Sequence, residues 1–189
     1  MNSSKPSKTS KDKLNKRPVV WMTGLSGAGK TAIANALAEK LKRKQIPVTV
    51  LDGDVIRTGL SKDLTFSNED RIENMRRIAE VAKLFSVAEV IPIVSFISPF
   101  KKERENCKNT IGEDQFIEVF ISTSLHICEI RDPKGLYAKA RAGTIPNFTG
   151  IDSPYEEPEN PDLIISTETQ TIEESTSIIF NYLIKQMND

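Results

Sequence analysis

The residues best suited to chemistry lie near the N-terminus, where glycines are spaced around a lysine and a threonine. A glycine-rich backbone turns its N–H groups toward phosphate oxygens, and a following helix adds the positive end of its dipole. In such loops the lysine reaches the β- and γ-phosphates, and the hydroxyl binds Mg2+. This motif predicts an ATP-binding P-loop, formed by Gly24, Leu25, Ser26, Gly27, Ala28, Gly29, Lys30 and Thr31.

Two carboxylates follow the second apolar run of the chain, with one glycine between them. Asp52 and Asp54 are therefore expected at the edge of a sheet where open α/β folds bind ligands. One carboxylate there suits hydrated magnesium, and the other suits an attacking hydroxyl that must be oriented or deprotonated. Because Gly53 separates them, the two side chains are expected to have different roles.

A basic stretch later in the chain suits a mobile lid. Its cations would close over the transferred phosphoryl group, neutralise developing charge and exclude water. We expect this lid at about residues 131–150, with the cations Arg131, Lys134, Lys139 and Arg141.

The acceptor side of the site is expected to bind both an anion and an aromatic base. Arg71 and Asn74 stand at i and i+3 on one predicted helix face, and Arg57 precedes them. Arginine forks bind phosphate or sulfate oxygens, and the loop residues Phe66 and Phe148 offer rings on which a base can stack. This set predicts a nucleotide acceptor, although simple packing of each ring is the alternative.

Short apolar runs alternate with longer segments of helical periodicity, as in βαβ units. We expect an α/β fold of the P-loop NTPase type: a three-layer sandwich with a mostly parallel five-stranded sheet, helices on both faces and a basic lid. The expected strands are 18–23, 48–51, 90–96, 116–121 and 163–165, and the expected helices are 32–44, 67–88, 124–143 and 172–187. Residues 145–161, which are proline-rich and aperiodic, are expected to form an ordered functional loop.

The composition narrows the range of functions. The 189 residues suit one domain at 18–189, and Lys plus Arg equals Asp plus Glu at 26 each, so no global field attracts nucleic acid or a membrane. Two cysteines and one histidine provide neither a zinc cage nor a disulfide framework. Residues 1–17 are predicted to be a flexible basic tail without a secretory h-region, which indicates a cytoplasmic protein; a transit peptide is the alternative.

Beyond the P-loop, several segments resemble the adenylyl-sulfate kinase family in family order over about residues 18–165. These enzymes phosphorylate the ribose 3′-hydroxyl of adenosine 5′-phosphosulfate (APS) with ATP and Mg2+. The matching segments are the P-loop, Leu51 to Asp54 with Ile56-Arg57, Phe66-Ser67 with Asp70-Arg71, Glu73 to Arg77, Phe96 to Pro99, Arg131-Asp132 with Lys134 to Tyr137, and Phe148 to Asp152.

The resemblance implies a role for each matching residue. The adenine of APS would lie between Phe66 and Phe148, with its phosphosulfate on the arginines and Asn74. The implied substrate-binding residues are Arg57, Phe66, Arg71, Asn74, Ile97, Ser98, Lys134, Phe148 and Thr149. The implied catalytic residues are Lys30, Asp54, Asp52, Ser98 and Lys134, and the implied metal ligands are Thr31 and Asp54. Ser98 receives a binding role first, because direct in-line transfer from ATP is chemically sufficient.

The resemblance also implies a homodimer and a separate ATP sulfurylase that supplies APS. Two other interpretations stay open at this point. One is a P-loop kinase for another hydroxyl acceptor, such as a sugar or a nucleoside. The other is a non-catalytic nucleotide-binding module, against which the combination of Lys30, Thr31, Asp54 and Arg57 argues.

Overall fold

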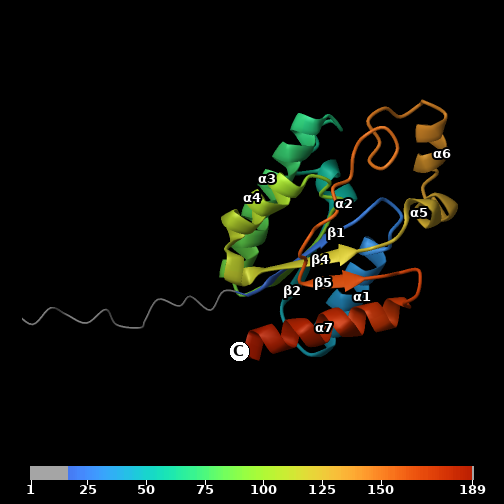
Figure 1. The fold of residues 1–189 in the computed structure, drawn as a ribbon. Coiled ribbons are helices and arrows are strands. Elements are labelled where there is room, and N and C mark those ends of the chain that lie inside the picture. The colour runs from blue at the N-terminus through green and yellow to red at the C-terminus, as the bar shows by residue number, and fades with distance from the viewer. Residues whose placement is uncertain (1–16, 189) are drawn as a thin grey trace, which may run out of the picture.

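The computed structural model describes residues 17–188 (Figure 1). The predicted tail at residues 1–16 lies outside the described part. Arg17, which the prediction included in the tail, is bonded to the body of the protein through its backbone. Its N–H donates to the carbonyl of Ser86 at 3.0 Å, and its own carbonyl accepts from the Ser86 hydroxyl at 2.5 Å.

The described strands form one five-stranded sheet in which every neighbouring pair is parallel, in the order β2-β3-β1-β4-β5. All carboxyl ends therefore meet at one edge. The prediction of five strands is confirmed, within a residue or two at their ends. The strands are β1 (Val19–Thr23), β2 (Val48–Asp52), β3 (Ile91–Ser95), β4 (Phe116–Ile121) and β5 (Leu163–Ile165).

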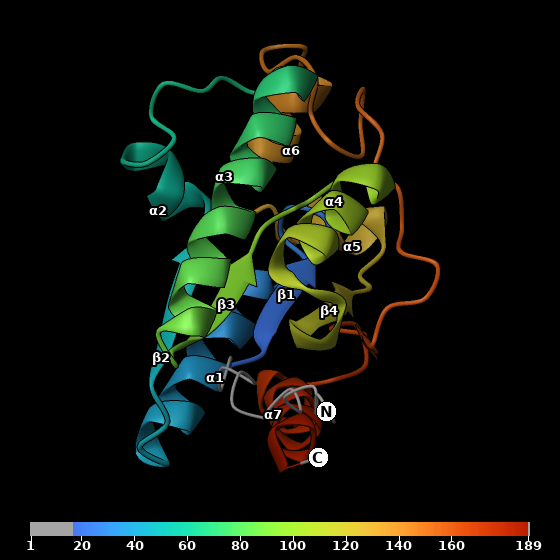
Figure 2. The ribbon, with the colours of Figure 1, turned by 90° about the vertical axis from the view of Figure 1, so that its left-hand side faces the viewer.

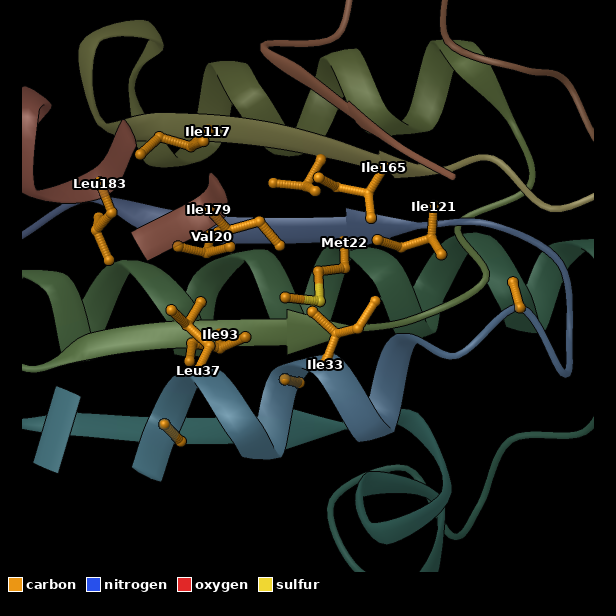
Figure 3. Packing of buried hydrophobic residues seen from close by; sticks show 14 of the residues in the cluster. Val20, Met22, Ile33, Leu37, Ile93, Ile117, Ile121, Ile165, Ile179 and Leu183 are labelled. Carbon is orange, nitrogen blue, oxygen red and sulfur yellow. The ribbon is translucent and has the colours of Figure 1, made fainter. Parts of the chain in front are cut away.

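The central strand β1 is buried on both faces, which explains its continuous apolar sequence. Successive side chains alternate between faces, so Val20 and Met22 join one core cluster while Val19 and Trp21 join the other. Figure 3 shows Val20 and Met22 packed among residues from the neighbouring strands and from two helices.

Helices cover both faces of the sheet and complete the predicted three layers. On one face α1 (Lys30–Arg43) packs against α7 (Ile172–Asn188), and on the other α3 (Asn68–Val87) packs against α4 (Lys101–Ile111). Figure 2 shows α3 and α4 in front of the sheet. Helix α3 begins with a side-chain cap, because the Ser67 hydroxyl accepts from the Asp70 N–H at 3.1 Å. Among residues 17–188, no helix has the length and apolar content needed to cross a bilayer.

The prediction of one helix over 124–143 is wrong. The structure has two short helices, α5 (Leu125–Arg131) and α6 (Leu136–Arg141), separated by a turn. Asp132 leaves the helical region at φ 17, and Gly135 adopts a left-handed φ of 64. The Asp132 carboxylate then accepts from the N–H groups of Tyr137 and Ala138, so it caps the second helix.

Two helices were not expected from the sequence. Helix α2 (Gly53–Thr58) is short and lacks buried residues. Helix α4 buries a stripe of Arg104, Cys107 and Ile111, in which an arginine takes the first position. Because a charged residue takes one of the buried positions, the sequence of α4 lacks the apolar periodicity that predicts a helix. Residues 145–161 contain no helix or strand, as predicted, and cross the carboxyl edge of the sheet (Figure 1).

Candidate active site

The P-loop leaves β1 at its carboxyl end and leads directly into α1, the arrangement that the motif needs. Glycine is required at the first position of the loop. Gly24 has φ 149, and a Cβ there would lie 2.6 Å from the carbonyl oxygen of Ile121. Gly29, with φ 105, caps the helix that begins at Lys30. The backbone is thus shaped to turn its amides toward an anion at a helix N-terminus.

Lys30 is held inside this loop. Its Nζ donates to the carbonyls of Gly24 at 2.8 Å and Leu25 at 2.7 Å, and only 8% of the residue is exposed. Burial lowers the pKa of Lys30 from 10.5 to about 8. The loop therefore keeps a poorly hydrated cation where the phosphates of a nucleotide would lie, and such a charge is more effective than one in bulk water.

The two carboxylates have separate surroundings in the structure. Asp52 accepts from the Thr31 hydroxyl at 2.7 Å and from the Asp54 N–H at 3.0 Å, so it joins the P-loop helix to the start of α2. Asp54 instead pairs with Lys134 from the turn between α5 and α6. Sequence reasoning named Asp52 but missed its bond to Thr31.

These oxygens suit magnesium. Mg2+ takes hard oxygen ligands and usually keeps several waters beside one or two protein groups and the substrate phosphates. Thr31 and the two carboxylates provide a hydroxyl and acidic oxygens next to the P-loop. The residues present therefore fit the metal that the P-loop predicts.

On the acceptor side, Arg57 and Phe66 form one unit. The guanidinium of Arg57 lies 4.3 Å from the centroid of the Phe66 ring and donates to the Thr65 carbonyl at 2.8 Å. Phe66 is 62% exposed, which is unusual for so large an apolar side chain. An exposed ring backed by a cation is a platform on which a planar base can stack.

Arg71 connects α3 to the loop at the predicted lid. Its guanidinium donates to the hydroxyls of Thr149 at 2.7 Å and Ser153 at 3.3 Å, and to the carbonyl of Asn147. The structure thereby brings together two predicted acceptor residues, Arg71 and Thr149, that are 78 positions apart. One turn along α3, Asn74 is 4% exposed, and its Oδ1 finds no hydrogen-bond partner within the described part of the chain.

Phe148 differs from Phe66 in its surroundings. It is 9% exposed and packs edge-on against Tyr137, with ring centroids 5.0 Å apart. Its N–H and that of Asn147 donate to the Asp152 carboxylate at 2.5 and 2.7 Å, so a tight turn fixes the ring. The adenine sandwich between the two phenylalanines stays a prediction.

Ile97 and Ser98 follow β3 at the same edge of the sheet. The Ser98 hydroxyl accepts from the Trp21 indole N–H at 3.0 Å, and the residue is 2% exposed. Ile97 is half-buried, and its carbonyl accepts from the Thr23 hydroxyl at 2.7 Å. Both predicted residues thus lie on a turn bonded to β1.

Sequence reasoning missed Thr167, which follows β5. Its hydroxyl donates to the Ala28 carbonyl at 2.9 Å and accepts from Arg131 at 2.8 Å. The sequence offered one indication of its role: Thr167 comes just after a predicted strand, and residues at the carboxyl ends of parallel strands meet at the ligand-binding edge. Arg131 belongs to the predicted lid cations, and its guanidinium is bonded next to the P-loop.

A cavity of about 510 Å3 lies between the flank of the P-loop and residues 150–157. Leu25, Thr123 and Tyr155 are among its lining residues, but Arg57, Phe66, Arg71 and Asn74 are not. The acceptor groups described above therefore lie outside this cavity, along the open carboxyl edge.

Comparison with known proteins is consistent with this geometry. The adenylyl-sulfate kinase of Pseudomonas entomophila is 56% identical over 165 residues, which cover 87% of this chain and 79% of that protein. The adenylyl-sulfate kinase of Bacillus licheniformis is 54% identical over 172 residues, which cover 91% of this chain and 87% of that protein.

Solved structures show the same relationship. The Mycobacterium tuberculosis APS kinase in complex with AMPPNP and APS is 45% identical, with a TM-score of 0.87 over 90% of this chain and 98% of that chain. The hexameric APS kinase from Thiobacillus denitrificans is 31% identical, with a TM-score of 0.68, and the match covers 92% of this chain but 30% of that one. The family model described as Adenylylsulphate kinase matches residues 16–166. The chain therefore belongs to the adenylylsulphate kinase family.

Proposed function

We propose that this enzyme transfers the γ-phosphoryl group of ATP to the 3′-hydroxyl of APS, giving ADP and 3′-phosphoadenosine 5′-phosphosulfate. The observation that carries the proposal is the meeting of two anion-binding groups at one sheet edge. The P-loop cation Lys30 follows the central strand β1, the Arg57 and Arg71 guanidiniums belong to α2 and α3, and Asp54 lies at the start of α2, just after the edge strand β2. A relative of this fold was solved with an ATP analogue and APS.

In the proposed transfer, the acceptor oxygen attacks the γ-phosphorus in line with the leaving oxygen of ADP. A bond from the acceptor oxygen to phosphorus forms, and the bond from the β–γ bridging oxygen to phosphorus breaks. Asp54 orients the hydroxyl and takes its proton. Lys30 stabilises the charge on the β- and γ-phosphate oxygens. Thr31 and Asp54 would hold magnesium, with Asp52 orienting Thr31, and the metal supplies charge neutralisation on the phosphates.

The acceptor is bound by the groups described above. Arg57, Arg71 and Asn74 hold the phosphosulfate, and the Oδ1 of Asn74, which has no partner among residues 17–188, accepts from a hydroxyl of the ligand or from a bound water. Phe66 and Phe148 bind the adenine. Ile97, Ser98 and Thr149 line the same site, where hydrogen bonds to Thr23, Trp21 and Arg71 fix their positions.

We further propose that residues 131–150 act as a basic lid. The turn between α5 and α6 reaches the carboxylate side through the Lys134–Asp54 ion pair, although both side chains are largely exposed. Bound phosphates compete for Lys134, which then leaves Asp54 free to act on the acceptor hydroxyl. The lid thereby links nucleotide binding to the availability of the base.

The test is a coupled ADP-release assay with ATP, Mg2+ and APS, alongside sugars and nucleosides as alternative acceptors. We expect turnover with APS far above the ATPase background. Turnover only with another acceptor would replace the assignment. Isothermal titration with ADP and APS distinguishes a non-catalytic module, which would bind both ligands without turning over.

Phe66→Ala is expected to weaken APS binding by about 1–3 kcal/mol, because one stacking face of the adenine is lost. The ring is 62% exposed, so stability is expected to change by no more than about 0.5 kcal/mol. Isothermal titration and thermal unfolding measure the two quantities. Phe148→Ala is a poorer test, because Phe148 is buried and its truncation also costs stability.

Leu84→Ala is the matched control, since Leu84 is a 69% exposed apolar residue on α3 far from the predicted pocket. It is expected to bind APS as the wild type does. Equal losses in both variants would argue against adenine stacking on Phe66.

We also propose that the enzyme is a cytoplasmic homodimer and depends on a separate ATP sulfurylase for APS. A hexameric relative supports self-association within the family. Light scattering after size exclusion measures the subunit number, and a monomer at micromolar concentration would contradict the dimer.

A further inference from the structure

Arg104 is a buried charged residue that has no role in the reaction proposed above. It lies on α4, one of the two helices that cover one face of the sheet, and is 3% exposed. Its Nε donates to Glu118 Oε1 at 2.8 Å and one Nη donates to the Ser98 carbonyl at 2.8 Å, whereas the other Nη has no partner among residues 17–188. Burying such a pair is costly, and apolar residues of similar volume often serve packing as well or better.

The backbone that Arg104 contacts is strained. Ser98 has φ 47, a left-handed conformation that a residue other than glycine adopts at a cost of about 1–3 kcal/mol. Surrounding bonds must hold it there. The Ser98 carbonyl accepts from Arg104 and, at 3.3 Å, from Thr23, while its hydroxyl accepts from Trp21.

The same turn is bonded to the beginning of the P-loop. The Ile97 carbonyl accepts from the Thr23 hydroxyl at 2.7 Å and from the Gly24 N–H at 3.4 Å. Thr23 ends β1, and Gly24 is the first residue of the P-loop. The Ile97–Ser98 turn therefore lies between Arg104 on α4 and the loop that binds the donor phosphates.

We propose that Arg104 is a positioning residue, which holds the Ile97–Ser98 turn so that the acceptor faces the γ-phosphate. This inference rests on the proposed function, in which that turn lines the APS site. The guanidinium is suited to the task because its fixed fork bonds Glu118 and the Ser98 carbonyl at once, whereas an ammonium is a single point charge. This role explains why a charged residue occupies a buried position of α4: its guanidinium holds the turn that lines the proposed APS site.

The test measures KM for APS and KM for ATP separately in two variants. Arg104→Lys keeps a cation opposite Glu118 but loses the fixed fork. Arg104→Met combined with Glu118→Leu removes the whole ion pair and leaves neither partner charged and alone. We expect KM for APS to rise about tenfold in each, with KM for ATP within about twofold of wild type.

Asn106→Ala is the control on the same helix, because it removes only an exposed side-chain bond to Glu103. It is expected to keep both KM values. If Arg104→Lys does not fold, the double variant decides alone. A wild-type KM for APS in a folded Arg104 variant, or equal increases in both KM values, overturns the inference. Failure of the wild type to use APS would instead contradict the proposed function.

Discussion

Lys30→Met is expected to lower kcat by at least about 10^3-fold while the fold is retained. The Nζ of Lys30 is the buried cation of the P-loop, and removing a group that stabilises transferring phosphoryl charge has effects of this size. Steady-state kinetics at saturating ATP and APS measure the change. Lys44→Met, in an exposed lysine just after α1, is the matched control and is expected to keep wild-type turnover.

The same variant tests the lowered pKa of Lys30. Its pKa is about 8 in the folded chain and 10.5 as the unperturbed value. Between these pH values the unfolded chain binds more protons, so stability rises with pH. The destabilisation by Lys30 is fully present below pH 8 and is lost by pH 10.5. The free energy of unfolding of wild type minus that of Lys30→Met should therefore increase by roughly 3 kcal/mol from pH 7 to 10.5.

Activity should follow the opposite course. The protonated amine binds phosphate, so kcat/KM for ATP is expected to fall as the pH rises through about 8, because this parameter reports groups of the free enzyme. A profile that is flat from pH 7 to 9.5, together with a Lys30→Met variant that keeps its turnover, would remove Lys30 from the mechanism.

Asp54→Asn is expected to lower kcat by about 10^2- to 10^4-fold, the range for losing a positioned general base. The amide keeps the shape of the side chain but takes up no proton and binds magnesium poorly. Asp54 is exposed, so the melting temperature should stay within a few degrees of wild type. Single-turnover kinetics with saturating ATP and APS separate the chemical step from product release.

Asp114→Asn provides the control for Asp54, because it changes an exposed carboxylate in the short 3-10 turn before β4. Asp52→Asn is informative beside it. Asp52 holds the Thr31 hydroxyl and caps α2, so its loss should mainly raise KM for Mg-ATP. If Asp54→Asn turned over at the wild-type rate and Asp52→Asn did not, the roles of the two carboxylates would be exchanged.

The sequence by itself determined the features that local spacing controls. The P-loop needs glycines, a lysine and a hydroxyl at neighbouring positions, so its eight residues were recognisable without a fold. The strands were recognisable because each is a short apolar run, buried in a sheet covered on both faces. Prediction failed where a local pattern was interrupted. The turn from Asp132 to Gly135 divides the single helix expected at 124–143, and Arg104 interrupts the apolar periodicity of α4, which was not expected.

The tertiary structure decided which of these residues meet. Thr31 with Asp52, Lys134 with Asp54, and Arg71 with Thr149 are 21, 80 and 78 positions apart. No spacing along the chain encodes such contacts, because they follow from parallel strands ending at one edge and from a loop returning across it. The same holds for Arg104. Arginine is usually found at the surface. Burial of Arg104 is possible because the fold brings Glu118 and the Ser98 carbonyl within hydrogen-bond distance of its guanidinium.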